Sequence, residues 1–291
     1  MRFTKYHALG NDYLVVDPKD LGHEITASEV RMMCDRHYGI GADGILYGPL
    51  KSQSSDFALR IFNPDASEAE KSGNGLRIFC RYLWDSGLVG EDEFSVETKG
   101  GDVRATIHDL GHLVSIEMGE VRFSHSIEKF QSPRSETINI AGRFFEFYRA
   151  SVGNPHCVIL VDKLAPALAI EYGPVIENNE KFDNRTNVQF MKVIDRNKIQ
   201  IEIWERGAGY TFASGSSSTA AAAVAFGLGL CGSKVSVNMP GGVIEVAFRE
   251  GFSAKMKGAV CKIGEGHVAD EALQAFDELR AQKTGGVGVP D

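Results

Sequence analysis

The chain of 291 residues has no uninterrupted apolar run near the ~20 residues that a membrane-spanning helix needs. Its first residues also lack the apolar segment of a secretory signal peptide. No low-complexity tract is present, and 43% apolar with 24% charged residues is typical of a globular protein. We therefore expect a cytoplasmic location and no membrane partner.

The sequence contains few cysteines, and its acidic residues outnumber its basic residues. The five cysteines are odd in number and show no metal-ligand spacing, so we expect free thiols in a reducing compartment and no metal site. They are Cys34, Cys80, Cys157, Cys231 and Cys261. Lysine and arginine total 31 against 39 acidic residues, which leaves a net charge of −8 and argues against a nucleic-acid partner.

One short stretch places small residues directly before a helix. Residues 71–75 read Lys-Ser-Gly-Asn-Gly and lead into the apolar residues 76–84. The first-turn N–H groups of such a helix point beyond its end, and glycine lets the backbone approach a ligand closely. The stretch therefore predicts an anion site, although a Gly-rich helix start also serves as a simple connector.

This pattern recurs once, which indicates an internal duplication. Ser214 follows Ser72 by 142 positions, and it also lies in a small-residue turn before a helix. Two further landmarks recur at 143 and 141 positions, namely Gly-Asn at 10 and 153 and Gly-Gly at 100 and 241. Such a long period predicts paired domains rather than a solenoid.

We expect the first domain over residues 1–117 and the second over residues 118–263, with residues 117–128 as the crossover. Residues 264–291 should form a C-terminal helix and tail, which either packs on the rest of the chain or mediates a homodimer contact. Within the first domain, a helix is expected from about residue 26, with Ser28 as its N-cap.

Longer motifs resemble the diaminopimelate epimerase family of cofactor-independent amino-acid racemases. They are HALGNDY (7–13), RIFN (60–63), SGNG (72–75), GNPH (153–156) and ERGAG (205–209). The resemblance extends from about residue 1 to 261. It implies an α/β (α+β) fold of two pseudo-symmetric domains, each a curled sheet or barrel around a central helix. It also implies a role in amino-acid biosynthesis, an amino acid or carboxylate as substrate in a cleft between the domains, and no cofactor.

The resemblance places Ser72 and Ser214 where the family has two cysteines that exchange protons with the substrate α-carbon. A thiol titrates near ~8.5, and lower at a helix N-terminus, so a thiolate base is accessible at neutral pH. A serine hydroxyl needs an adjacent base to ionise. His156 is a candidate for that base because its family equivalent lies at the ligand, but it could equally be a hydrogen-bonded core histidine.

The same resemblance assigns binding residues. Several residues match family contacts to a far carboxylate or ammonium group, or to the ligand generally: Asn11, Asn63, Asn154, Asn187, Glu205 and Arg206. At the near end we expect backbone N–H groups to bind an anion, from Gly73, Asn74, Gly215 and Ser216. The asparagines have an alternative as turn or cap residues. The Glu205–Arg206 pair has an alternative as an exposed ion pair of ~0–1 kcal/mol.

Three further positions depart from the family: Gly44 replaces glutamine, Tyr210 replaces glutamate and Ser217 replaces glycine. A laboratory exchange of two cysteines for serine would not explain these three, so we favour natural divergence. Three functions remain open. The first is an isomerase with altered proton transfer. The second is a lyase, cyclase or tautomerase that works without cysteine, like the phenazine-biosynthesis branch of this fold. The third is a binding module without catalysis. In the second case His156, Asp43 or Tyr210 would act.

Overall fold

The computed structural model describes residues 1–123 and 132–285, with side chains up to residue 279. The chain divides into two compact units. Unit 1 combines residues 1–107 with 260–291, and unit 2 comprises residues 108–259. Within the described ranges, no helix is long and apolar enough to cross a membrane.

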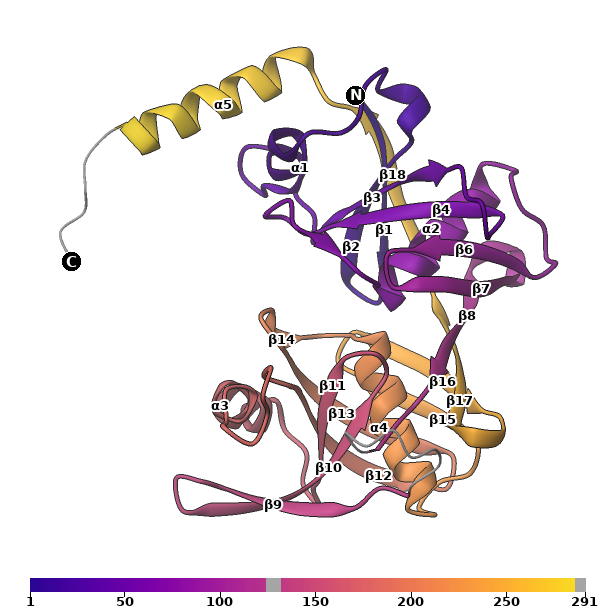
Figure 1. The fold of residues 1–291 in the computed structure, drawn as a ribbon, viewed down its shortest axis with the longest axis vertical. Helices are drawn as coiled ribbons and strands as arrows, with labels where there is room; N and C mark the ends of the chain where they lie inside the picture. Colours follow the sequence, from indigo (N-terminus) through magenta and orange to yellow (C-terminus); the bar gives the residue numbers. More distant parts are fainter. Residues whose placement is uncertain (124–131, 286–291) are drawn as a thin grey trace. The chain divides into compact units, whose positions relative to one another are not determined.

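Unit 1 contains a mixed sheet and three α-helices (Figure 1). Its strands are β1 (Arg2–Ala8), β2 (Asn11–Val16), β3 (Ile45–Leu50), β4 (Phe57–Phe62), β5 (Glu68–Ala69), β6 (Phe94–Thr98), β7 (Gly101–His108) and β18 (Cys261–His267). Its α-helices are α1 (Ala27–Cys34), α2 (Gly73–Asp85) and α5 (Asp270–Gly285).

Unit 2 has the same kinds of element. Its strands are β8 (Leu113–Glu120), β9 (Ser135–Ile140), β10 (Arg143–Ser151), β11 (Pro155–Leu160), β12 (Asn187–Asp195), β13 (Lys198–Glu205), β14 (Gly209–Thr211), β15 (Lys234–Met239), β16 (Gly242–Phe248) and β17 (Ser253–Ala259). Its α-helices are α3 (Pro166–Glu177) and α4 (Gly215–Gly227). Short 3-10 helices cover Pro18–Asp20, Asp109–Gly111 and Glu250–Phe252.

The two units repeat one pattern of strand pairing. β2 pairs with β3 in parallel, as β11 does with β12, and both pairs continue with an antiparallel partner, β4 or β13. β4 then pairs in parallel with β6, as β13 does with β15, and each of these strands forms a hairpin with the next. This equivalence confirms the α/β fold with an internal duplication.

The ends of the two repeats are exchanged. β18, at the end of the second repeat, pairs antiparallel with β1 in unit 1. β8, which follows the first repeat, pairs antiparallel with β17 in unit 2. The units therefore divide the chain near residues 107 and 260 rather than at the expected 117 and 263. The expected crossover at 117–128 begins in β8, and its residues 124–128 lie outside the described residues.

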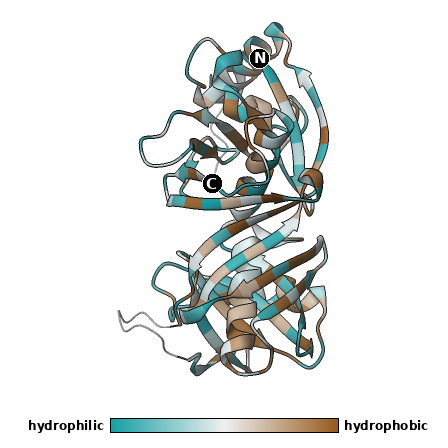
Figure 2. Ribbon diagram, turned by 90° about the vertical axis from the view of Figure 1, so that its right-hand side faces the viewer, coloured by the Kyte–Doolittle hydropathy of each residue, from teal (hydrophilic) through white to brown (hydrophobic). Residues whose placement is uncertain are grey.

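Each unit is built around one buried helix. Residues Asn74–Cys80 of α2 are buried without interruption, and so are Ser217–Ala225 of α4. A helix on a surface would expose every third or fourth residue, so both helices must be covered on all sides. α2 contacts β1, β2 and β3, whereas α4 contacts β10 to β13 and β15 to β17. Along several strands hydrophobic and hydrophilic residues alternate, as Figure 2 shows, so one face packs inward.

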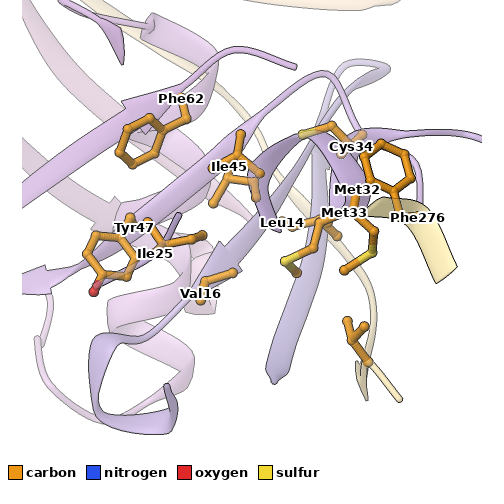
Figure 3. Close-up of a cluster of buried hydrophobic side chains, with 13 residues drawn as sticks. Leu14, Val16, Ile25, Met32, Met33, Cys34, Ile45, Tyr47, Phe62 and Phe276 are labelled. Carbon is orange, nitrogen blue, oxygen red and sulfur yellow. The ribbon is translucent and has the colours of Figure 1, made fainter. Parts of the chain in front are cut away.

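A second core in unit 1 secures α1 and α5 (Figure 3). Met32 and Met33 of α1 pack with Leu14 of β2 and Ile45 of β3. Phe276 of α5 is 8% exposed and belongs to the same cluster. The C-terminal helix therefore packs on its own chain, one of the two expected roles.

The N-cap prediction for α1 was wrong by two residues. Thr26 is the N-cap, because its hydroxyl accepts from the Glu29 N–H while the Glu29 carboxylate accepts from the Thr26 N–H. This reciprocal capping box satisfies two helix-end donors at once. Ser28 instead hydrogen-bonds to Asp277 of α5.

Candidate functional site

Ser72 is the N-cap of α2, as the sequence predicted for a helix start at Gly73. Its Oγ accepts a hydrogen bond from the Gly75 N–H at 3.0 Å. A side chain at position 75 would crowd this oxygen, since an added Cβ would lie 3.2 Å from Ser72 Oγ. The N–H groups of Gly73 and Asn74 belong to the same first turn, whose donors point beyond the helix end.

Asn11 and Asn74 are held together beside this turn. Asn74 Nδ2 donates to Asn11 Oδ1 at 3.0 Å, and Asn11 Nδ2 donates to Asp43 Oδ2 at 2.7 Å. On the other side, the fully buried Arg77 donates to Asn74 Oδ1 at 2.9 Å. Burial lowers the pKa of Arg77 to about 10, so the guanidinium still carries its charge at neutral pH. It therefore places a positive charge one turn below the helix start.

Asp43 and Asp12 form an ion-pair network with two cations. Arg36 Nη2 lies 2.8 Å from Asp12 Oδ1 and 2.7 Å from Asp43 Oδ1, and Lys5 Nζ lies 2.9 Å from Asp12 Oδ2. Burial raises the pKa of Asp12, but the hydrogen bonds from Arg36 and Lys5 outweigh it and hold that pKa below its usual range. The network fixes the start of β2, where Asn11 lies.

Asn63 lies in unit 1. The other residues that are expected to bind the far carboxylate or ammonium group of the ligand lie in unit 2. Asn63 Nδ2 donates to Ser67 Oγ at 2.9 Å, and its N–H donates to the Ser67 carbonyl. These contacts are those of a turn residue, which was the alternative interpretation.

Ser214 occupies the equivalent position in unit 2, as the N-cap of α4. It is 5% exposed, and its Oγ accepts from the Ser217 N–H at 3.4 Å. The Ser216 hydroxyl lies 3.5 Å from the same oxygen. Gly215 is buried beside it, so this helix start is more enclosed than that of α2.

His156 of β11 is 1% exposed, and its Nε2 lies 3.0 Å from Asn154 Oδ1. Burial lowers the pKa of His156 to about 3, the nearby charge of Arg206 acts in the same direction, and interaction with the Gln189 side chain only partly offsets them. Gln189 Nε2 donates in turn to Ser217 Oγ at 3.0 Å. His156 is therefore neutral at physiological pH and a weak base.

The loop at Glu205 and Arg206 is anchored by its backbone. The Arg206 N–H donates to Asn187 Oδ1 at 3.0 Å, and Asn187 Nδ2 donates to the Pro155 carbonyl at 2.9 Å. Parallel pairing of β11 with β12 sets Asn187 opposite His156. Asn154, His156, Asn187 and Arg206 are thus linked by contacts within unit 2.

A residue outside the predicted set supports this loop. Glu177 of α3 is 5% exposed and accepts three hydrogen bonds. The donors are Arg185 Nη1 at 3.0 Å, the Gly207 N–H at 2.9 Å and Trp204 Nε1 at 2.7 Å. Glutamate in a helix is ordinarily a solvated residue, so nothing in the sequence distinguishes Glu177 from its neighbours.

Tyr210 donates to Glu202 Oε2 at 2.6 Å. Burial and this carboxylate raise the pKa of Tyr210 to about 12, which keeps the phenol protonated. Within residues 1–123 and 132–279, no three His, Cys, Asp or Glu side chains are grouped as metal ligands.

The fold is that of racemases and isomerases. A probable proline racemase from Agrobacterium radiobacter superposes with a TM-score of 0.67 at 17% identity, over 94% of this chain and 95% of that one. A phenazine biosynthesis protein from Bacillus anthracis superposes with a TM-score of 0.64 at 15% identity, over 92% and 99%.

Sequence similarity narrows the class further. The diaminopimelate epimerase family profile matches residues 3–124 and 148–263. Diaminopimelate epimerase 2 of Nostoc sp. is 56% identical over 275 residues, which cover 93% of this chain and 96% of that protein. The diaminopimelate epimerase of Stutzerimonas stutzeri is 38% identical over 92% and 99%. The chain belongs to the diaminopimelate epimerase family and is an enzyme of the isomerase class.

Proposed function

We propose that the protein is an isomerase that acts at the α-carbon of diaminopimelate or a similar two-headed amino acid, without pyridoxal phosphate. The observation that carries this proposal is the 56% identity, over nearly the whole chain, to a relative named diaminopimelate epimerase 2. The local arrangement of the site residues in each unit supports it.

Each of the two helix starts is suited to bind a carboxylate of the ligand. Their donors are the N–H groups of Gly73 and Asn74 in α2 and of Gly215 and Ser216 in α4. A helix N-terminus stabilises an anion by ~0.3–1 kcal/mol at an exposed site, and by more when it is partly buried, as at Ser214. The same donors would stabilise the enolate-like charge that develops when the α-proton leaves.

The far end of the ligand would meet Asn154, Asn187, Glu205 and Arg206. An arginine holds a carboxylate with two parallel hydrogen bonds, which gives orientation as well as affinity. The Arg206 side chain is exposed, and Nη1 donates to the Asn184 carbonyl at 3.0 Å. Its backbone is fixed by Asn187, so the guanidinium can turn to a ligand without moving the loop.

Proton transfer would be slower than with a pair of thiols. A neutral serine hydroxyl forfeits much of the general-base contribution, typically ~10²–10⁴-fold. The serines at both helix starts favour a second candidate function, a lyase or tautomerase that moves a more acidic proton. In that case the substrate supplies the acidity that Ser72 and Ser214 lack.

The test is solvent deuterium exchange at the α-carbon of diaminopimelate, followed by NMR together with interconversion of its stereoisomers. We compare the unsubstituted protein, the double variant Ser72→Cys with Ser214→Cys, and Ser86→Cys as the matched control at the exposed end of α2. An isomerase with altered proton transfer is supported if exchange is slow in the unsubstituted protein and rises at least tenfold in the double variant but not in the control variant. An ordinary enzymatic rate in the unsubstituted protein contradicts the argument from serine. No exchange in any of the three contradicts the isomerase.

A further inference from the structure

Tyr13 lies against the Ser72 hydroxyl. It belongs to β2, is 7% exposed, and its Oη lies 3.2 Å from Ser72 Oγ. Ser72 Oγ also accepts the Gly75 N–H at 3.0 Å. The serine oxygen is therefore held from two sides, by the first turn of α2 and by a phenol from a neighbouring strand.

Gly44 provides the space for this tyrosine. A Cβ added at position 44 would lie 2.7 Å from Tyr13 Cε1 and 2.5 Å from the Phe62 carbonyl oxygen. Gly44 is not among the glycines with positive φ, so backbone conformation does not demand glycine here. The absence of a side chain at 44 is explained by the Phe62 carbonyl oxygen together with the Tyr13 ring.

In the second repeat the position equivalent to Tyr13 is His156, which follows Gly153 as Tyr13 follows Gly10. Among the described residues, the ring of His156 contacts Asn154 and not the Ser214 hydroxyl. The contacts of Ser214 Oγ with described residues are the Ser217 N–H at 3.4 Å and the Ser216 hydroxyl at 3.5 Å. Neither the Ser217 N–H nor the Ser216 hydroxyl ionises in the pH range in which proteins function. The two serines are thus chemically unequal, although their places in the duplicated fold are equivalent.

A phenol changes what Ser72 can do. Tyrosine ordinarily titrates near ~10, within ~1.5 units of a thiol, whereas a serine hydroxyl has no accessible ionisation of its own. A phenol in contact with the serine can therefore act as the source or the sink of the proton that passes through Ser72.

We propose, on the basis of the proposed function, that Tyr13 is a positioning residue that forms a proton relay with Ser72. When Ser72 protonates the substrate carbanion, its O–H bond breaks and a C–H bond forms, while the Tyr13 proton moves to Ser72 Oγ and leaves a phenolate. In the reverse direction Ser72 takes the α-proton as its own proton passes to the phenolate. The relay serves one face of the α-carbon only.

The first experiment measures α-hydrogen exchange of diaminopimelate in Tyr13→Phe. The matched control is Tyr6→Phe, because Tyr6 pairs with Tyr13 across β1 and β2, is also buried, and donates to Asp85 instead of Ser72. We expect Tyr13→Phe to lower kcat at least tenfold with KM changed less than threefold, and Tyr6→Phe to keep the unsubstituted rate. Site-specific 3-fluorotyrosine at position 13, a more acidic phenol, should keep exchange and alter its rate. An unchanged kcat in Tyr13→Phe overturns the relay.

The second experiment does not need turnover. In a Ser72→Cys background, the alkylation rate of the thiol at 72 by iodoacetamide is followed by peptide mass spectrometry, with and without Tyr13→Phe. Removing the phenol should slow alkylation at least threefold, because the thiolate loses a hydrogen-bond donor. An equal rate in both proteins overturns the Tyr13 contact. A slower rate together with no exchange on diaminopimelate supports the contact and rejects the proposed substrate.

Discussion

The stability of the loop that carries Arg206 should depend on the negative charge of the Glu177 carboxylate. The change Glu177→Gln keeps the volume of this side chain but turns one oxygen into an NH₂ group. That group cannot accept from Trp204 Nε1 at 2.7 Å or from the Gly207 N–H at 2.9 Å, so at least one of these part-buried donors loses its partner. The remaining bond also loses its charged acceptor.

The magnitude follows from these contacts. An unsatisfied buried donor costs ~1–3 kcal/mol, and a hydrogen bond to a charged group is worth ~1 kcal/mol more than a neutral one. The ion pair with Arg185 adds little, because Arg185 is 53% exposed and exposed pairs contribute at most ~1 kcal/mol. Because both donors are only part-buried, the lower end of these ranges applies, and we expect the free energy of unfolding to fall by about 1–2 kcal/mol.

The assay is urea unfolding, where a lower midpoint with an unchanged slope reports a stability loss. The matched control is Glu171→Gln, an exposed glutamate of the same helix. Faster amide exchange at Gly207 in Glu177→Gln would locate the effect in the loop. A loss below ~0.5 kcal/mol, equal to that of Glu171→Gln, would refute the reasoning, since surface changes fall in that range.

Two further predictions concern His156 and Arg206. The pKa of His156 is about 3 in the folded state, whereas unfolded histidine titrates near ~6.5. As the pH falls below ~6.5, the unfolded state binds a proton that the folded state does not bind. The contribution of His156 to the free energy of unfolding is therefore complete above pH ~6.5 and is lost as the pH falls toward 3. Urea unfolding at pH 7 and pH 5 should show a loss of about 2 kcal/mol that His156→Asn lacks; the same loss in both proteins would contradict the prediction. Arg206→Ala should weaken a two-headed ligand by about 10- to 100-fold in calorimetry and barely affect a single-headed acid. Equal losses for both ligands would mark Arg206 as structural.

The sequence predicted the duplicated fold because the signals involved are local. Small residues before an apolar run mark the starts of α2 and α4. Ser72 and Ser214, which belong to these small-residue stretches, are the N-caps of the two helices. Gly87 and Gly229 have φ of +68° and +72° just after these helices, as helix C-termini require. Repetition of these signals at one spacing was enough to indicate the repeat.

The domain limits could not be predicted in the same way. β8 has consecutive buried residues and β18 is largely exposed, so neither shows a pattern that identifies its partner strand. The partners of both strands lie more than a hundred residues away. Which edge a strand joins depends on non-local hydrogen bonds that leave no local pattern. The error at the N-cap of α1 was of another kind, because Thr26 and Glu29 form the S/T-x-x-E pattern of a capping box, which can be recognised in the sequence itself.

By itself, the sequence determined the class of fold and the two helix starts with their serines, because backbone propensity and capping are local properties. Only the tertiary structure decided the chemical state of the site residues. His156 is neutral because residues from other strands exclude water from it, and Ser72 differs from Ser214 because β2 brings the Tyr13 phenol to one of them. Burial and contact distance set pKa values and hydrogen bonds, and both arise from segments that meet only when the chain folds.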